Sequence, residues 1–435
     1  MSNKPKKICL ISLGCPKNLT DSEELLGNLC AEDYQIVQNE ADADIAVLNT
    51  CAFIAPAVKE AETEIKNLLK LKKSGHLEKV IICGCLVERE KEKLKKKFPQ
   101  IDSVVSTKAI NKIIIAVKKN GAYLKNSSEL LLSPDYKLRL TAEHSAYLKI
   151  ADGCDNCCSY CLIPSLKGHF RSKSIEMIVN ETADLIANGA KEISLIAQDT
   201  TNYGVDLYGK PMLPKLLKKL IKIPKLKWLR LMYVYPERLS RELLNLIKNE
   251  KVICNYLDIP LQHISNNVLK AMNRQSTEKS IRAKIAEIRK IVPNISLRTN
   301  FMTGFPGETE KDFQKLLSFI KEIEFDYVGI FPYSKEKGTT AFNLKPQIPE
   351  KIKQKRVNLL IDAQSAVIDK INARIINKKV PILMDNAKYG RTVSEAPDID
   401  GAFLVESKKE LKPGSFVQAE IVKAVGYNRK AIPVK

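Results

Sequence analysis

The chain has 435 residues, a formal net charge of +21 and a hydrophobic fraction of 44%. This length is too great for one ordinary hydrophobic core, so we expect two to three domains. No apolar run approaches the roughly 18 residues needed to cross a bilayer. The N-terminus also lacks a signal-peptide pattern, which predicts a cytoplasmic protein. The positive charge comes mainly from Lys residues on predicted helices, and it fits solvated surfaces as well as an RNA-binding surface.

The first predicted domain, residues 1–124, alternates strand and helix patterns. Three apolar runs are each followed by an amphipathic helical pattern, the runs being 7–13, 43–50 and 79–84 and the helices 21–29, 56–71 and 88–97. This rhythm predicts a doubly wound parallel sheet. A cysteine follows each strand closely: Cys15, Cys51 and Cys85. Because ligands collect at the carboxyl ends of parallel strands, we expect these thiols to meet, unless two of them lie in loops by chance.

The other cysteines need a separate account. The chain has 11 cysteines, and structural disulfides are rare in the cytoplasm. Cys9, Cys30 and Cys254 lie within apolar stretches and are predicted to be small core residues. The clustered cysteines instead indicate metal binding or catalysis.

A polar linker is predicted at 125–139, and strand and helix patterns resume in the second domain, 140–371. Helical patterns, such as 177–187, 279–291 and 310–323, separate six candidate strands, at 147–151, 192–197, 227–233, 256–260, 296–302 and 327–332. Six such units predict a partly or fully closed (β/α)6 barrel whose site lies at the strand carboxyl ends. Residues 372–435 consist of short alternating runs and predict a small all-β barrel.

Four cysteines lie within eight residues in "CDNCCSYC", directly after the first barrel strand. Read as two abutting C-x-x-C pairs, the segment makes a poor zinc site, because structural zinc usually takes its pairs from separate turns. Read as Cys154-x-x-x-Cys158-x-x-Cys161, it offers three thiolates to a four-iron cube and leaves one iron open, with Cys157 as a bystander. Tyr160 either lies at the cluster edge or simply packs.

This loop resembles the signature of radical S-adenosylmethionine (SAM) enzymes. The segments "ISLGCPKNLTDSE", "LNTCAFIAPA" and "CGCLVERE" further resemble the N-terminal domain of the methylthiotransferases, and the C-terminal region resembles the TRAM domain. The resemblance covers essentially the whole chain. It implies two [4Fe-4S] clusters, one held by Cys154, Cys158 and Cys161 with SAM on its open iron. The second would be held by Cys15, Cys51 and Cys85, and Cys83 lies outside the pattern.

Within the family, motifs such as "SLGCPKN", "LDIPLQH" and "APDIDG" resemble those of the branch that modifies the twelfth protein of the small ribosomal subunit. This implies that one SAM donates a methyl group to sulfur on the second cluster. Another SAM would yield a 5′-deoxyadenosyl radical that removes hydrogen from the β-carbon of an aspartate, which then receives the methylthio group. An external one-electron donor, contact with ribosomal RNA and a monomeric state are also expected. The alternatives are a tRNA adenosine methylthiotransferase and a non-catalytic metal-binding RNA chaperone.

The resemblance also implies contacts to SAM. Gly304, Gly307 and Glu308 in "TGFPGETE" would lie along the SAM site, or form an ordinary strand–helix turn. Gln198 and Asp199 close a barrel strand and would contact the methionine or ribose, although Asp199 could instead cap the next turn. Four residues depart from the family pattern without replacing a cluster ligand: Lys167, Lys173, Asn300 and Asn377.

Overall fold

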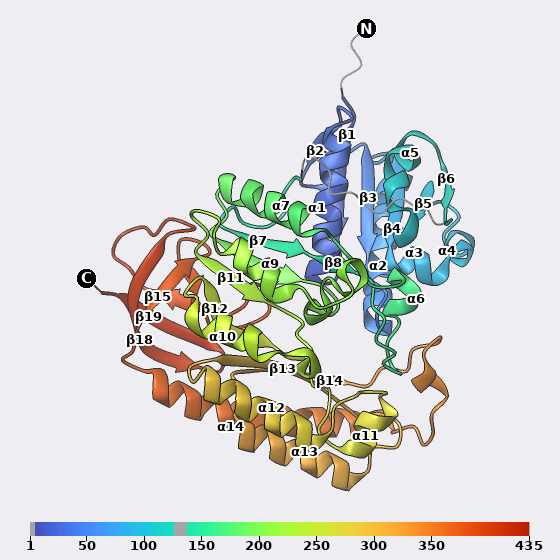
Figure 1. The fold of residues 1–435 in the computed structure, drawn as a ribbon. Coiled ribbons are helices and arrows are strands. Elements are labelled where there is room, and N and C mark those ends of the chain that lie inside the picture. The colour runs from blue at the N-terminus through green and yellow to red at the C-terminus, as the bar shows by residue number, and fades with distance from the viewer. Residues whose placement is uncertain (1–4, 126–136, 435) are drawn as a thin grey trace. The chain divides into compact units, whose positions relative to one another are not determined.

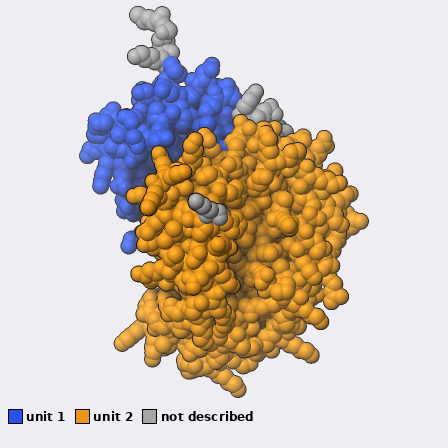
Figure 2. Space-filling model, turned by 90° about the vertical axis from the view of Figure 1, so that its left-hand side faces the viewer, with its two compact units in different colours: residues 1–140, 152–156, 161–170 blue, residues 141–151, 157–160, 171–435 orange. Residues whose placement is uncertain are grey.

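The computed structural model describes residues 5–125 and 137–434. Most of the predicted linker, 125–139, therefore lies outside the described residues. The chain divides into two compact units (Figure 2), the first comprising 1–140, 152–156 and 161–170, and the second 141–151, 157–160 and 171–435. No helix in the described ranges is both long and apolar enough to span a membrane.

The first unit contains a six-stranded sheet in which every neighbouring pair is parallel (Figure 1). Its strands in spatial order are β2 (Gln35–Val37), β1 (Lys7–Ser12), β3 (Ile45–Thr50), β4 (Lys79–Gly84), β5 (Ser103–Ser106) and β6 (Gly121–Tyr123). The helices are α1 (Pro16–Cys30), α2 (Ala55–Lys73), α3 (Cys85–Glu90), α4 (Glu92–Lys97), α5 (Ile113–Lys118) and α6 (Ile163–Lys167).

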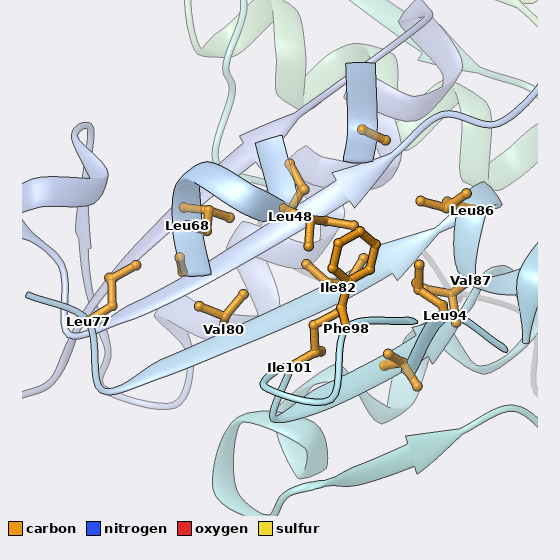
Figure 3. Packing of buried hydrophobic residues seen from close by; sticks show 14 of the residues in the cluster. Leu48, Leu68, Leu77, Val80, Ile82, Leu86, Val87, Leu94, Phe98 and Ile101 are labelled. Atoms are coloured by element: carbon orange, nitrogen blue, oxygen red, sulfur yellow. The ribbon is translucent and has the colours of Figure 1, made fainter. Parts of the chain in front are cut away.

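Helices cover both faces of this sheet, because successive residues of a strand point to opposite sides. In β3 and β4, Leu48 and Ile82 pack with Leu68 of α2 in one apolar cluster (Figure 3). Their neighbours Val47 and Ile81 face the other way, into a second cluster with residues of α1 and α5. Strands buried on both faces have continuous apolar sequences, and for this reason the sequence predicts them well.

The local structure of the first unit departs from the predictions. The helix predicted at 88–97 is two helices, α3 and α4, separated at Lys91, whose φ is +50°. The segment is rich in Glu and Lys and contains no Gly or Pro, so nothing in it marks the break. Strands β2, β5 and β6 are not predicted by the sequence, because three or four residues are too few to display a period.

The second unit contains another six-stranded parallel sheet, which remains open. Its strands in spatial order are β14 (Tyr327–Pro332), β13 (Ser296–Thr303), β12 (Ile253–Asp258), β11 (Trp228–Leu231), β10 (Glu192–Ile196) and β7 (Ser145–Lys149). Two short strands follow β7, namely β8 (Ala151–Asp152) and β9 (Arg171–Ser172). The helices are α7 (Ile175–Ala187), α8 (Val205–Tyr208), α9 (Leu213–Leu220), α10 (Arg241–Asn249), α11 (Asn266–Ala271), α12 (Glu278–Ile291), α13 (Glu310–Ile323) and α14 (Glu350–Ile375).

The end of the chain forms a closed five-stranded barrel that belongs to the second unit. Its strands, in order around the barrel, are β15 (Lys379–Met384), β16 (Tyr389–Arg391), β17 (Phe403–Val405), β19 (Asn428–Pro433) and β18 (Phe416–Val425). The predicted fold class is confirmed: a doubly wound parallel sheet, an open (β/α)6 barrel and a small all-β barrel.

The small barrel is joined to the large sheet by the segment 391–400, which we call the docking segment. It forms hydrogen bonds or ion pairs with a side chain from each of the six parallel strands. These side chains are Tyr147 of β7, Glu192 of β10, Arg230 of β11, Tyr256 of β12, Arg298 of β13 and Tyr327 of β14.

Glu192 is the centre of this contact. Its two carboxylate oxygens each lie 2.9 Å from a guanidinium nitrogen, one of Arg230 and one of Arg391, and its side chain is 0% exposed. Although burial acts to raise it, the two guanidinium groups hold the pKa of Glu192 below its ordinary value. Removing the carboxylate charge would leave two guanidinium groups buried without their shared partner.

We therefore expect Glu192→Gln to lower the free energy of unfolding of the metal-free protein by about 3–5 kcal/mol, the range for breaking a buried ion pair. Urea unfolding followed by circular dichroism measures this change. The matched control is Glu242→Gln, since Glu242 pairs with Lys218 at 2.7 Å while both side chains are more than half exposed. That change should cost less than about 1 kcal/mol. Equal losses in the two variants would contradict the assignment.

Candidate functional site

The three cysteines of the first unit lie at the carboxyl ends of adjacent strands. Cys51 directly follows β3, and Cys85 directly follows β4 as the first residue of α3. Cys15 follows β1 after two intervening residues and is the N-cap of α1. Because β1, β3 and β4 are neighbours in the sheet, their carboxyl ends bring these residues to one edge.

Backbone geometry shows how closely two of these loops approach each other. Gly14 has φ +97°, and a Cβ atom there would lie 2.6 Å from Cys51 Cβ and 3.1 Å from Cys51 Sγ. Only glycine fits between the loop of Cys15 and Cys51. The thiols also influence one another: burial raises the pKa of Cys85 to about 12, and the neighbouring Cys51 and Cys15 contribute to that rise. The geometry thus brings all three predicted residues together.

A buried cation accompanies this group. Lys167 is 8% exposed, donates to Asp21 Oδ2 at 2.6 Å, and lies 3.8 Å from Asp152 Oδ2. Its ammonium group opposes the rise that burial causes in the pKa of Cys85. In the sequence, Lys167 stands out only as a departure from the family pattern. Its spacing from the cysteines gives no sign that it lies beside them.

The remaining cysteines outside the loop differ in how deeply they are buried. Cys83 is fully buried in β4 within the apolar cluster on one sheet face, and burial raises the pKa of its thiol. Cys9 and Cys254 are buried as predicted. The prediction for Cys30 was wrong: it is exposed, because it is the last residue of α1 and lies beyond the buried stripe of that helix.

The second set of cysteines lies in the loop that follows β7 and β8. In the first unit, the backbone N–H groups of Asn156 and Ile163 point at the sulfur atoms of Cys154 and Cys161, each at 3.4 Å. Such N–H donors favour a thiolate over a thiol. In the second unit, Cys158 Sγ lies 3.8 Å from Tyr235 Oη and 3.9 Å from Arg274 Nη1. The side chain of Cys157 is exposed.

The residues predicted to contact SAM have clear roles within their own loops. Tyr160 is half-buried and packs against the apolar cluster of Val268, Met272, Phe305, Tyr333 and Ala341, as its packing interpretation predicted.

Asp199 follows Gln198 beyond the end of β10 and is the N-cap of the short 3₁₀ turn Thr200–Asn202, where it accepts from Asn202 N at 3.2 Å. Asp199 also pairs with Arg238. The capping alternative is therefore present in the structure, and the contact of either residue with SAM stays a prediction.

Glu308 holds together the loop between β13 and α13. Its carboxylate accepts from Gly304 N at 2.6 Å and from Phe305 N at 3.2 Å, and it pairs with Arg356 at 2.9 Å. Burial raises the pKa of Glu308, and Arg356 opposes that rise. Gly304 and Gly307 both have positive φ, so the loop has the strand–helix turn geometry that was one of the two interpretations.

No group of three or more His, Cys, Asp or Glu side chains among the described residues is arranged to share a single metal ion. A four-iron cube makes a different demand, since each thiolate binds its own iron and the sulfurs do not converge on one point. Each set offers three thiols, which is the donor chemistry that such a cube binds. Sequence reasoning missed Lys167, Tyr235 and Arg274, because these side chains approach the sulfurs only through tertiary contacts.

Comparisons with known proteins show which families the chain resembles. Residues 7–106 match the Uncharacterized protein family UPF0004, residues 148–320 the Radical SAM superfamily and residues 376–434 the TRAM domain. A protein of Elusimicrobium minutum (strain Pei191), named Ribosomal protein uS12 methylthiotransferase RimO, is 54% identical over 97% of this chain and 98% of its own length. A protein of the same name from Caldanaerobacter subterraneus subsp. tengcongensis is 45% identical over 97% of this chain and 99% of its own.

The chain belongs to the RimO family. Among solved structures, the radical S-adenosylmethionine methyltransferase TsrM from Kitasatospora setae has a TM-score of 0.53 over 75% of each chain. Its sequence is only 14% identical, so this likeness concerns the fold. Membership of the RimO family confirms the predicted branch, which rested on motifs such as "SLGCPKN", "LDIPLQH" and "APDIDG".

The close approach at Gly14 yields a prediction. Gly14→Ala should displace Cys51 and lower the iron bound on anaerobic reconstitution, because the new methyl group would overlap Cys51 Cβ. Iron and acid-labile sulfide analysis measures the loss. Gly75→Ala is the matched control, since Gly75 has φ +81° but no neighbouring atom within 4 Å of the position that an added Cβ would take. It carries a similar backbone cost of about 1–2 kcal/mol without the overlap and should bind iron normally. Normal iron binding by Gly14→Ala would contradict the assignment.

Proposed function

We propose that this protein is a radical SAM methylthiotransferase that adds a methylthio group to the β-carbon of an aspartate in ribosomal protein uS12. The observation that carries the proposal is the meeting of Cys15, Cys51 and Cys85 at one sheet edge, in a chain of the RimO family that also has the three-cysteine loop after β7 and β8. One three-cysteine set serves any radical SAM enzyme. The additional set, Cys15, Cys51 and Cys85, supports sulfur transfer.

Six cysteines would hold the two [4Fe-4S] clusters: Cys15, Cys51 and Cys85 for one, and Cys154, Cys158 and Cys161 for the other. When bound, these clusters with SAM supply hydrogen-atom abstraction and the sulfur that is transferred. The β-carbon of an aspartate bears no acidic proton at neutral pH, so the chain needs no strong general base near the substrate. Its own residues bind, orient and exclude water.

Individual residues would support the clusters and the SAM site. Lys167, paired with Asp21, would offset the negative charge of thiolates around Cys85. Glu308 fixes the Gly304 loop through the backbone N–H groups that it binds, which would keep one wall of the SAM site rigid. Gln198 and Asp199 would lie at the end of β10 beside the methionine or ribose, and Gly307 would allow SAM to approach the backbone closely.

The proposal includes partners that the fold does not itself display. The ribosomal protein would be met in the cytoplasm, with the small C-terminal barrel contacting ribosomal RNA, and reduction would come from an external one-electron donor. A tRNA adenosine methylthiotransferase would use the same chemistry. The relatives named for uS12 over nearly full length favour the protein substrate.

A triple variant tests whether one cluster serves SAM cleavage and the other serves methylthio transfer. Cys15→Ala, Cys51→Ala and Cys85→Ala together should reduce the iron content from about eight to about four per chain, one cube being lost. Reductive cleavage of SAM to 5′-deoxyadenosine should persist, while methylthio transfer to a uS12 loop peptide should fall below detection by mass spectrometry. Cys30→Ser is the control, because that exposed cysteine belongs to neither set.

Methylthio transfer by the triple variant would refute the proposed role of the first set. Substrate choice is decided separately by offering the intact enzyme the uS12 peptide and tRNA in parallel. Modification of tRNA alone would refute the ribosomal-protein assignment. Tight RNA binding without any SAM cleavage would instead support the RNA-chaperone alternative.

A further inference from the structure

Arg274, three residues beyond the end of α11, is a buried cation. Its side chain forms no ion pair among the described residues, although the residue is only 8% exposed. It donates from Nη2 to the carbonyl oxygen of Pro260 at 3.1 Å, while Nε has no hydrogen-bond partner. A buried guanidinium group of this kind is expected to face an anion.

The guanidinium group of Arg274 lies over an aromatic ring. Arg274 Cζ is 4.4 Å from the centroid of the Tyr235 ring, which is a cation–π contact. Nη1 then lies 3.9 Å from Cys158 Sγ, and the hydroxyl of Tyr235 lies 3.8 Å from the same sulfur. Glu237 also favours the charged guanidinium group, but its carboxylate accepts from Ser276. Two polar groups therefore converge on one sulfur.

The backbone around Arg274 is tied to the backbone around Cys158. Ser159 donates from N to the carbonyl of Met272 at 3.0 Å and from Oγ to the carbonyl of Ala271 at 2.7 Å. Asn273, whose φ is +55°, donates from its side chain to the carbonyl of Cys157 at 2.7 Å. These three contacts keep the end of α11 in register with the cysteine loop. The approach of Arg274 to the sulfur is therefore held by the fold.

We propose that Arg274, stacked on Tyr235, is a positioning residue that sets the reduction potential of the cluster bound through Cys158. The inference rests on the proposed function. Hydrogen bonds to a ligand sulfur and a nearby positive charge stabilise the reduced cluster, which carries one more electron, and so raise its potential. That electron comes from the external one-electron donor. Arg274 thereby makes the cluster easier to reduce before SAM is cleaved.

The test measures the midpoint potential of this cluster alone. In the full chain carrying Cys15→Ala, Cys51→Ala and Cys85→Ala, a redox titration followed by electron paramagnetic resonance reports only the cluster of the Cys158 loop. Adding Arg274→Gln should shift the potential to more negative values, because it removes the charge. Arg274→Lys should restore part of the shift, and Tyr235→Phe should produce a smaller negative shift.

Arg282→Gln is the matched control. Arg282 also stacks on an aromatic ring, Phe319 at 5.1 Å, but it pairs with Glu278 and Glu322 on α12 and α13. Its loss should leave the potential unchanged. An unchanged potential in Arg274→Gln, with about four irons still bound, would overturn the inference.

Two further outcomes are also decisive. Should Arg274→Gln fail to bind iron, Tyr235→Phe becomes the deciding variant, and an unchanged potential there would overturn the inference. Should the parent triple variant neither bind iron nor cleave SAM, the proposed function itself would be refuted. Failure of the function is thus distinguishable from failure of the role of Arg274.

Discussion

The parallel alignment of strands is the constraint on which the rest of this structure depends. Parallel neighbours end at the same edge of a sheet, so residues far apart in sequence meet there whenever each follows its own strand. Cys15, Cys51 and Cys85 are brought together in this way in the first sheet. The second sheet uses the same edge for the loop of Cys154, Cys158 and Cys161, which follows β7 and β8. The loop cysteines need no such meeting of separate strands, because they lie within eight consecutive residues.

Both sets of cysteines have a buried cation near a sulfur atom. Lys167 opposes the rise in the pKa of Cys85 in the first unit, and Arg274 reaches Cys158 in the second. Thiolates in a site of low polarity are costly unless a positive charge or hydrogen-bond donors compensate them. The two solutions differ chemically. Lys167 is itself neutralised by Asp21, whereas Arg274 forms no ion pair among the described residues and keeps its full charge for the cysteine loop.

The docking segment gives the second unit its polar interior. The sheet of six parallel strands remains open, and residues 391–400 supply partners for one side chain of every strand. Buried ion pairs such as that of Glu192 contribute little net stability but penalise any misplacement of the segment. The small barrel therefore acts as a structural part of the second unit in addition to any role toward a substrate.

The sequence alone determined the elements whose signal is local. The apolar run 79–84 predicted a strand at the observed residues, because a buried parallel strand needs continuous apolar side chains. The spacing of Cys154, Cys158 and Cys161, together with the family motifs, predicted radical SAM chemistry. The sequence did not predict the short strands, because they show no hydrophobic period. It did not predict the break at Lys91, because no Gly or Pro marks it.

Only the tertiary structure decided which distant side chains serve the candidate sites. Lys167 and Arg274 are ordinary basic residues in a Lys-rich chain, and nothing near them in sequence separates them from the exposed ones. Their roles arise from contacts with Asp21, Tyr235 and the cysteine sulfurs. Such contacts depend on how loops from separate strands pack at one edge. A local pattern of residues does not predict that packing.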